Sequence, residues 1–538
     1  MPEPQLPCIS CSIKTSDCDR KESPIMLTHT GSAALTGIEA IPLEVEVHTS
    51  GRGEQEIVSI VGLPDAAVKE SRERIRSALY SCGYEHPAGS TLVNLAPADL
   101  KKEGAAFDLP IALGLAAAAG AFDPTLLQDA MILGELALDG GIRPVRGILS
   151  VALMAREHKE FGKLIVPAKN VSEAIVAAAK LKVYPVASLP EAIAALRGEL
   201  LPVDPSAADA LFAEPDWADI PDFAEVKGQS AAKRAMEVAA AGGHNLLMVG
   251  PPGAGKSMLA KRLPGILPPM TEAETLATSR IHSIMGLLPA DSPLVRTRPF
   301  RSPHHTVSDV GLIGGGSNPG PGEISLAHNG VLFLDELPEF KRTVLEVLRQ
   351  PMENGSVTIS RAAGSFTFPC EFMLVAAMNP CPCGHLGDRR HVCRCRQMQI
   401  QNYRARISGP LLDRIDLHVE LAALSEDELL AHGAPAESSR SIRERVMKAR
   451  AIQQERFKGT KITCNGRMEP AHLLKYCKLD PQTETLIRHA IEEFGLSARA
   501  YDRILRVSRT IADLAGSERI RREHLFEAIG YRSLDRRN

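Results

Sequence analysis

Hydrophobic and polar positions alternate at strand spacing in several stretches of the first 200 residues. The strand candidates are residues 43–50, 56–63, 91–100 and 131–145. Residues 65–83 place apolar side chains at helical spacing and end at Gly83, which predicts a helix that stops there. Residues 109–122 are almost continuously apolar and rich in alanine, which predicts a buried helix. Together these patterns predict an α/β domain over residues 26–200.

A second strand-and-helix pattern follows, and the chain ends in helices alone. The strand candidates are residues 245–249, 331–334 and 372–377, so residues 224–424 are predicted to form another α/β domain. Residues 425–538 are predicted to form a helical lid. One apolar face there recurs at steps of three and four through Leu496, Ala500, Ile504, Val507, Ile511 and Leu514. Arg499, Arg503, Arg506 and Arg509 lie on other faces of the same helix.

Two segments show neither the strand nor the helix periodicity of apolar residues. Residues 1–25 are polar and are predicted to be a disordered tail, so that either Met1 or Met26 is the true start. Residues 201–223 are rich in proline, aspartate and alanine, which is typical of a linker.

Composition narrows the functional classes. The chain has 538 residues, of which 44% are hydrophobic, so it can build several domains with large cores. The formal net charge of the chain is −3, so the chain as a whole lacks the positive charge typical of nucleic-acid-binding proteins. Any DNA site must therefore be a local patch or a pore. The apolar run at 109–122 is shorter than the ~18 residues of a membrane span, and the N-terminus has no apolar signal-peptide core. We expect no membrane partner and a cytoplasmic location.

Residues 250–257 read GPPGAGKS and match the phosphate-binding pattern G-x-x-x-x-G-K-[S/T]. The motif follows an apolar strand and opens a helix, which is the context it requires. Glycines let backbone N–H groups wrap phosphates, Lys256 can reach the β- and γ-phosphates, and the Ser257 hydroxyl can hold Mg²⁺. We therefore predict that ATP and Mg²⁺ bind at Gly250, Pro251, Pro252, Gly253, Ala254, Gly255, Lys256 and Ser257.

Two carboxylates end the apolar strand at 331–334. Ligands of open α/β sheets bind at the carboxyl ends of the strands, so Asp335 is predicted to bind Mg²⁺, directly or through water. Glu336 is predicted to polarise the attacking water. An apolar run followed by Asp-Glu is common by itself, but together with the P-loop it indicates an ATPase.

These motifs resemble those of AAA+ ATPases. The resemblance implies that Asn379, at the end of a third strand, is the sensor that aligns the attacking water. It also implies that Arg414, within LLDRID, is an arginine finger presented to the γ-phosphate of a neighbouring subunit, hence a ring, most often of six subunits. The alternative for Arg414 is an ion pair within its own chain, with Asp413 or Asp416.

Near the C-terminus, the string LSARAYDRILRVSRTIADL resembles the second sensor motif of the AAA+ superfamily. The resemblance implies that Arg499 contacts the γ-phosphate bound by its own chain. Arg503, one helical turn further on, is the alternative.

Two insertions narrow the AAA+ branch. Residues 355–369 alternate, turn and alternate again, which predicts a β-hairpin, and a Gly/Pro-rich insertion beginning RPFRSPHHT lies before the 331–334 strand. Insertions at these places resemble those of magnesium chelatase motor subunits and MCM helicases, where they form hairpins in the central pore. Arg361 at the hairpin tip is a candidate DNA-backbone contact, with an ordinary exposed turn arginine as the alternative.

Residues 27–534 as a whole resemble the YifB/ComM family of magnesium-chelatase-like AAA+ proteins. Strings that carry the resemblance include ALTGIEA, VNLAPADLKKEGAAFDLPIALGLAAA, NPCPCG and RISGPLLDRIDLHVE. The family implies a homo-hexameric, ATP-dependent DNA motor, and ComM-type members are branch-migration helicases that extend recombining DNA during natural transformation. A chelatase-like motor acting on a protein partner is the first alternative.

An ATP-dependent protease is the second alternative, because the N-terminal domain also resembles the Lon protease fold. The positions that match the Lon serine and lysine hold Ala106 and Leu149 here. Neither side chain can act as nucleophile or base, so we predict a non-proteolytic domain.

Four cysteines crowd into the string NPCPCGHLGDRRHVCRCR: Cys381, Cys383, Cys393 and Cys395. Four thiolates satisfy a tetrahedral Zn²⁺ site, with His385 and His391 as spare ligands, although C-x-x-C is the commoner spacing. Free reduced thiols in a loop are the alternative. Nearby arginines, which either meet DNA phosphates or offset the charge of a zinc–thiolate cluster, are Arg389, Arg390, Arg394 and Arg396.

Overall fold

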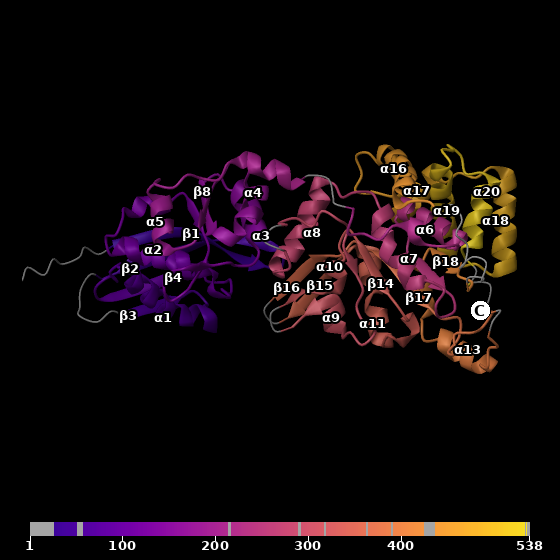
Figure 1. Cartoon of the computed structure of the whole chain (residues 1–538), viewed down its shortest axis with the longest axis horizontal. Coiled ribbons are helices and arrows are strands. Elements are labelled where there is room, and N and C mark those ends of the chain that lie inside the picture. Colours follow the sequence, from indigo (N-terminus) through magenta and orange to yellow (C-terminus); the bar gives the residue numbers. More distant parts are fainter. Residues whose placement is uncertain are drawn as a thin grey trace, which may run out of the picture.

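The computed structural model describes residues 26–50, 57–212, 217–288, 292–316, 319–361, 364–388, 391–423, 436–532 and 534. The predicted disordered tail, Arg389 and Arg390 lie outside these residues. Among the helices in these ranges, none has the length and apolar character needed to cross a membrane. The N-terminal domain lies at one end of the long axis, the P-loop domain in the middle and the C-terminal helices at the other end (Figure 1).

The N-terminal domain is built on a seven-stranded mixed sheet of order β3-β4-β2-β1-β5-β8-β9. Its strands are β1 (Met26–Thr36), β2 (Glu39–Thr49), β3 (Ile57–Val61), β4 (Ser90–Ala96), β5 (Ala130–Ile132), β8 (Lys163–Pro167) and β9 (Lys182–Val186). β2 pairs antiparallel with β1 and β4, and the remaining neighbours are parallel. The predicted α/β character of this region is confirmed.

Five α-helices pack around this sheet: α1 (Ala66–Ser81), α2 (Asp108–Ala118), α3 (Ile148–Glu157), α4 (Val171–Ala178) and α5 (Leu189–Leu196). α1 begins where the Asp65 carboxylate accepts a hydrogen bond from the N–H of Val68 (2.8 Å) and ends before Gly83, whose φ is +76°. α2 is buried along its whole length, as its apolar sequence predicts. The strand predicted at 131–145 is wrong: the region forms three short strands, β5, β6 (Glu135–Leu136) and β7 (Ile142–Arg143).

The P-loop domain contains a five-stranded parallel sheet of order β11-β14-β17-β10-β18. Its strands are β10 (Leu246–Val249), β11 (Phe300–Arg301), β14 (Val331–Leu334), β17 (Met373–Met378) and β18 (Leu417–Glu420). All residues of β10, β14 and β17 are buried, as expected for parallel strands covered on both faces. The three strands predicted in this region are confirmed. The α-helices are α6 (Ser230–Gly242), α7 (Lys256–Arg262), α8 (Glu272–Ile284), α9 (Asp309–Ile313), α10 (Glu323–Leu326), α11 (Arg342–Val347), α12 (Arg349–Asn354), α13 (Gln397–Arg404) and α14 (Gly409–Leu412).

This sheet has two different edges because its strands all run in the same direction. At the edge where strands begin, Asn245 joins three of them: its Oδ1 accepts from the N–H of Leu374 (2.9 Å), its Nδ2 donates to the carbonyl of Arg414 (3.1 Å), and its N–H donates to Asp416 (2.9 Å). The P-loop lies at the opposite edge, after β10. A strand of four residues separates the two edges by roughly 13 Å at ~3.3 Å per residue.

The described part of this domain also contains two β-hairpins. The hairpin predicted at 355–369 is confirmed as β15 (Ser356–Arg361) and β16 (Gly364–Pro369). The Gly/Pro-rich insertion forms a second, smaller hairpin from β12 (Gly314–Gly315) and β13 (Gly320–Pro321). The two hairpins lie close together, since a Cβ added at Gly315 would sit 3.4 Å from Nη2 of Arg361.

The C-terminal region is helical, as predicted, with α16 (Ser439–Arg456), α17 (Pro470–Tyr476), α18 (Pro481–Phe494), α19 (Ala498–Leu514) and α20 (Arg522–Gly530). The apolar face of α19 packs into the same core as α6, α16 and α20. Arg509 lies off that face but is still buried, because Asp513 and the carbonyls of Ser517 and Glu518 satisfy its guanidinium.

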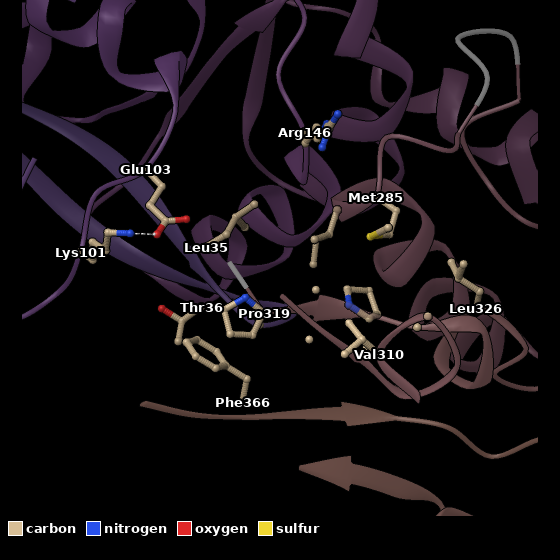
Figure 2. A pocket seen from close by; sticks show the side chains of 18 of the residues that line it. Leu35, Thr36, Lys101, Glu103, Arg146, Met285, Val310, Pro319, Leu326 and Phe366 are labelled. Carbon is tan, nitrogen blue, oxygen red and sulfur yellow. Dashed lines mark hydrogen bonds and ion pairs between the residues drawn. The ribbon is translucent and has the colours of Figure 1, made fainter. Parts of the chain in front are cut away.

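Helix α8 of the P-loop domain packs against the N-terminal domain. Arg280 donates to the carbonyl of Ile38 (3.0 Å) and to the carboxylate of Glu39 (2.7 Å). One turn further on, the Ser283 hydroxyl donates to Glu173 (2.5 Å). A cavity of about 690 Å³ lies at this junction, between Thr36 and Arg146 of the first domain and Met285, Pro319 and Phe366 of the second (Figure 2).

Candidate nucleotide-binding site

The P-loop joins the buried strand β10 to α7. Its backbone turns at Gly253 (φ +78°) and Gly255 (φ +88°), in the left-handed region that glycine adopts without steric cost. The Gly250 N–H donates to the carbonyl of Met378 (3.2 Å), which fixes the loop beside the end of β17. The sequence therefore places its glycines where the loop needs them to wrap an anion.

Lys256 lies at the centre of the site and is only 8% exposed. Its Nζ donates to the carbonyls of Gly250 (2.5 Å) and Pro251 (3.0 Å) and to Oδ1 of Asn379 (3.0 Å). Burial lowers the pKa of this ammonium group, while Asp335 and Glu336 act in the opposite direction. The acceptors around this buried ammonium group are neutral, and a bound polyphosphate would supply an anionic partner.

The Ser257 hydroxyl donates to Oδ2 of Asp335 at 2.6 Å. Hydroxyl and carboxylate oxygens are the hard ligands that Mg²⁺ prefers beside phosphates, so this pair fits the predicted metal position. Together with Glu336 and Asn379, these side chains line a cavity of about 320 Å³ with the P-loop. The structure thus brings together the predicted P-loop, Mg²⁺ and sensor residues of the strand ends.

Glu336 has a left-handed backbone (φ +51°), an uncommon conformation for a residue with a side chain. Its carboxylate is 59% exposed and lies 3.8 Å from Nδ1 of His305. Sequence reasoning gave no role to His305, although it lies within the string RPFRSPHHT. Its place beside Glu336 follows from the pairing of β11 with β14, which brings the segment after β11 to the same edge of the sheet.

Arg414 and Arg499 lie in a different cavity, also about 320 Å³, which shares no lining residue with the P-loop cavity. We call it the arginine cavity, and its charged lining residues are Glu353, Arg414, Asp416, Arg467, Glu469, Arg499, Asp502, Arg503 and Arg506. It lies at the edge where the strands begin, because Arg414 and Asp416 precede β18 and α19 packs beside them. The predicted contact of Arg499 with a γ-phosphate bound by its own chain therefore does not fit this structure.

Arg414 pairs with neither Asp413 nor Asp416. Its guanidinium donates to the carbonyl of Pro410 (2.7 Å) and contacts Glu353 (2.5 Å). Its Nε, and that of Arg506, is buried without a hydrogen-bond partner in the described part of the chain. Buried donors without acceptors are unfavourable, so both side chains retain unused capacity to bind an anion.

Arg503 is held by Asp416, which is 2% exposed. Burial alone would raise the pKa of the Asp416 carboxyl, but Arg503 and His244 hold that pKa well below its usual range. Arg499 is exposed and has no ion-pair partner among the residues that the structure places. Of the two predicted sensor candidates, Arg499 is therefore the one available to a ligand.

The four cysteines meet in the loop between β17 and α13. Their Sγ atoms all lie within 4.8 Å of one another. Backbone N–H groups of His385 and Arg394 hydrogen-bond to Cys383 and lower the pKa of its thiol to about 6. The two predicted spare ligands, His385 and His391, do not join the cysteines but pair with Asp388.

The other predicted positions are distributed over the surface and the N-terminal core. Arg361 is exposed at the end of β15, and Arg394 and Arg396 are exposed beside the cysteines. Leu149 is fully buried, and Ala106 packs against the same hydrophobic cluster. The two positions predicted to match the Lon serine and lysine are therefore part of the apolar packing.

Comparison with known families agrees with this architecture. Residues 222–429 match magnesium chelatase, subunit ChlI; residues 45–170 match subunit ChlI of Mg-chelatase; and residues 436–532 match the ChlI C-terminal region. Fold and site together thus define a magnesium-chelatase-like protein of the AAA+ ATPase class, whose members use ATP and Mg²⁺.

Full-length relatives narrow the class. The chain is 44% identical over 506 residues to competence protein ComM of Haemophilus influenzae, covering 94% of this chain and 97% of the relative. It is 42% identical over 514 residues to the YifB protein of Salmonella typhimurium (95% and 98% covered) and 42% identical over 513 residues to that of Escherichia coli (95% and 98%). The chain belongs to the YifB/ComM family of magnesium-chelatase-like AAA+ proteins.

Proposed function

We propose that this protein is an ATP-driven, ring-forming DNA motor that moves branched DNA during homologous recombination or natural transformation in the cytoplasm. The main support for this proposal is that the two parts of the ATPase site are separated within one chain. The P-loop cavity and the arginine cavity lie at opposite edges of one parallel sheet, and we call them the two half-sites. One chain cannot bring both to the same phosphate. A second chain, docked head to tail, can.

Hydrolysis in the proposed site follows from the side chains at the P-loop edge. Lys256 binds the β- and γ-phosphates once it exchanges its carbonyl partners for phosphate oxygens. Ser257 and Asp335 would hold Mg²⁺, which would neutralise the negative charge that develops on the phosphates. Asn379 orients the attacking water and Glu336 accepts its proton, so that water adds to the γ-phosphorus as the bond to ADP breaks.

Arg414 and Arg499 complete the proposed site from the next subunit. Both line the arginine cavity, where five arginines and four carboxylates meet, and the buried Nε of Arg414 has no acceptor among the described groups. Such an interface is heterologous and closes into a ring when its rotation divides a full turn. A homo-hexamer is our proposal for that ring.

DNA as the substrate is supported by two observations. A relative covering nearly the whole chain is a competence protein, and the P-loop domain has two adjacent hairpins, with Arg361 exposed at the end of β15. Arg361, Arg389, Arg390, Arg394 and Arg396 are the proposed contacts to the DNA backbone. The alternative is a motor that remodels a protein partner, favoured by the chelatase-type domains. A peptidase role is disfavoured by Ala106 and Leu149.

The test is the rate of ATP hydrolysis with and without single-stranded DNA and four-way junctions, with Lys256→Ala as the control. We expect DNA to stimulate a rate that the control lacks. A Lys256-dependent rate that ignores both DNA forms would instead favour the protein-remodelling motor. Stimulation by junctions would then justify a branch-migration assay with labelled strands.

A further inference from the structure

The cysteine loop has the geometry of a metal site. The Sγ atom of Cys381 lies 3.4 Å from that of Cys383 and 3.6 Å from that of Cys393, and the Cys383–Cys393 distance is also 3.6 Å. A zinc ion with four thiolates at ~2.3 Å spaces its sulfur atoms by about 3.8 Å. An iron–sulfur cluster distributes its thiolates over several irons and therefore spaces them more widely. The arrangement fits a single tetrahedral ion.

The loop between the two C-x-C pairs is braced so that the pairs meet. Oδ2 of Asp388 lies 3.3 Å from Nδ1 of His385 and 2.9 Å from Nδ1 of His391, and this carboxylate is only 4% exposed. Both imidazoles thus face the carboxylate through the nitrogen nearest the backbone. This brace holds His385 and His391 to Asp388 and leaves the four sulfurs as the ligand set.

The same loop contacts the ATP site at two points. Cys381 follows Asn379 by two residues and is fully buried, and Asn379 accepts a hydrogen bond from Lys256. Gly384 lies against the P-loop, because a Cβ added there would be 2.8 Å from Cδ of Pro252. The cysteine cluster therefore spans the end of the sensor strand and the phosphate-binding loop.

We propose that Cys381, Cys383, Cys393 and Cys395 bind one Zn²⁺ ion, and that this ion holds the loop against Pro252 and Asn379 in the position that ATP hydrolysis requires. Binding releases the thiol protons and leaves a cluster with a net charge of −2. The exposed guanidinium groups of Arg394 and Arg396 lie beside it and offset that charge. The proposed zinc binding does not depend on what the motor acts on. The proposed effect of zinc on the ATP site rests on the proposed ATP hydrolysis.

The first experiment measures metal in the full-length protein, purified without metal-affinity chromatography, by inductively coupled plasma mass spectrometry. We expect one zinc per chain, and its loss in the double variant Cys383→Ser/Cys393→Ser. The matched control Cys82→Ser, which changes a cysteine of the N-terminal domain, keeps its zinc. Replacement by Co²⁺ should give the visible absorption bands of tetrahedral thiolate coordination. A zinc-free wild-type protein, or one that contains iron and sulfide, would overturn the site.

The second experiment tests whether zinc binding controls ATP hydrolysis. It uses the wild-type protein, so its result does not depend on whether a cysteine variant folds. Zinc is released from the wild-type protein with a thiol-reactive mercurial and counted with a zinc-binding dye, and ATP hydrolysis is measured in excess Mg²⁺ before and after thiol and Zn²⁺ are restored. We expect hydrolysis to fall at least tenfold and to recover with Zn²⁺, at unchanged far-ultraviolet circular dichroism. Unchanged hydrolysis in zinc-free protein would overturn the coupling and leave the binding site standing. A wild-type protein that binds zinc but never hydrolyses ATP would instead count against the proposed function.

Discussion

Mixtures of inactive variants show on which chain each arginine acts. If Arg414 is the proposed finger, Arg414→Ala removes about 10³–10⁵ in hydrolysis, or about 4–7 kcal/mol of transition-state stabilisation. The ion pair that is lost is worth at most about 1 kcal/mol to folding, because Glu353 is 52% exposed and returns to solvent. Arg414 itself is buried, so losing its bond to the Pro410 carbonyl costs about 1 kcal/mol more. Lys256→Ala removes the P-loop cation of the chain that carries it. Each variant alone should therefore be folded and inactive.

An equal mixture of these two variants should recover part of the activity. The proposed site needs the P-loop of one chain and the arginine cavity of the next, so half of the sites in the mixture have an intact Lys256 and half of those face an intact Arg414. Hydrolysis should return to about a quarter of the wild-type rate if the sites act independently. The chains are mixed in dissociated form and assembled before the rate of phosphate release is measured.

A mixture of Arg414→Ala with Arg499→Ala serves as the discriminating control. Every chain in it lacks one arginine of the same cavity, so no site should be complete and the rate should stay at the level of the single variants. Recovery to about a quarter in this mixture would mean that Arg499 serves its own chain, which would refute our reading of the two sheet edges. Failure of the first mixture to recover would refute the shared site itself.

Three further predictions concern single groups. Glu336→Gln should lower kcat about 10²–10⁴-fold while ATP still binds, because only the proton acceptor is lost; binding of a fluorescent ATP analogue beside phosphate release checks this, and weakened binding would contradict it. His305→Ala should lower kcat no more than about fivefold, because an exposed pair is worth at most about 1 kcal/mol. The imidazole of His304 contacts Thr306 and lies 4.0 Å from the ring of His305 rather than beside Glu336, so His304→Ala should lower kcat less than His305→Ala does, and equal effects of the two variants would remove His305 from the site. Burial lowers the pKa of His418 to about 3, so the unfolded chain takes up a proton below pH ~6.5 that the folded chain refuses, and the free energy of unfolding should fall by up to about 1.4 kcal/mol per pH unit down to the folded pKa. Urea unfolding at pH 7 and pH 5 should show a shallower loss in His418→Gln, and identical losses would sink the argument.

Local patterns predicted the parts of the site that lie within one element. The P-loop, the β14 strand with Asp335 and Glu336, and the β15–β16 hairpin are each encoded by fewer than about twenty consecutive residues. Strand β1 was missed because its centre consists of Gly31 and other small residues that give weak alternation. The prediction of one strand at 131–145 fails because the chain turns at Gly140 (φ +85°), which separates β6 from β7.

Contacts between distant elements were not predictable in this way. The position of Arg499 depends on the packing of α19 beside the beginning of β18, and a helical pattern says which face is buried but not which edge of the sheet it meets. The pairing of His305 with Glu336 depends on two strands that are neighbours in the sheet and about thirty residues apart in the chain. The closure of the cysteine cluster depends on Asp388, which sequence spacing alone did not distinguish from its neighbours.

The placement of the two half-sites at opposite edges of the sheet also sets how the protein behaves on dilution. In the proposed arrangement a single chain binds the nucleotide at its P-loop, but its own arginine cavity lies too far away to contact that nucleotide. An open row of chains has one complete site fewer than its number of chains, and only a closed ring has as many sites as chains. Turnover per chain should therefore rise steeply with protein concentration, so that newly made or dispersed chains consume no ATP until they have assembled.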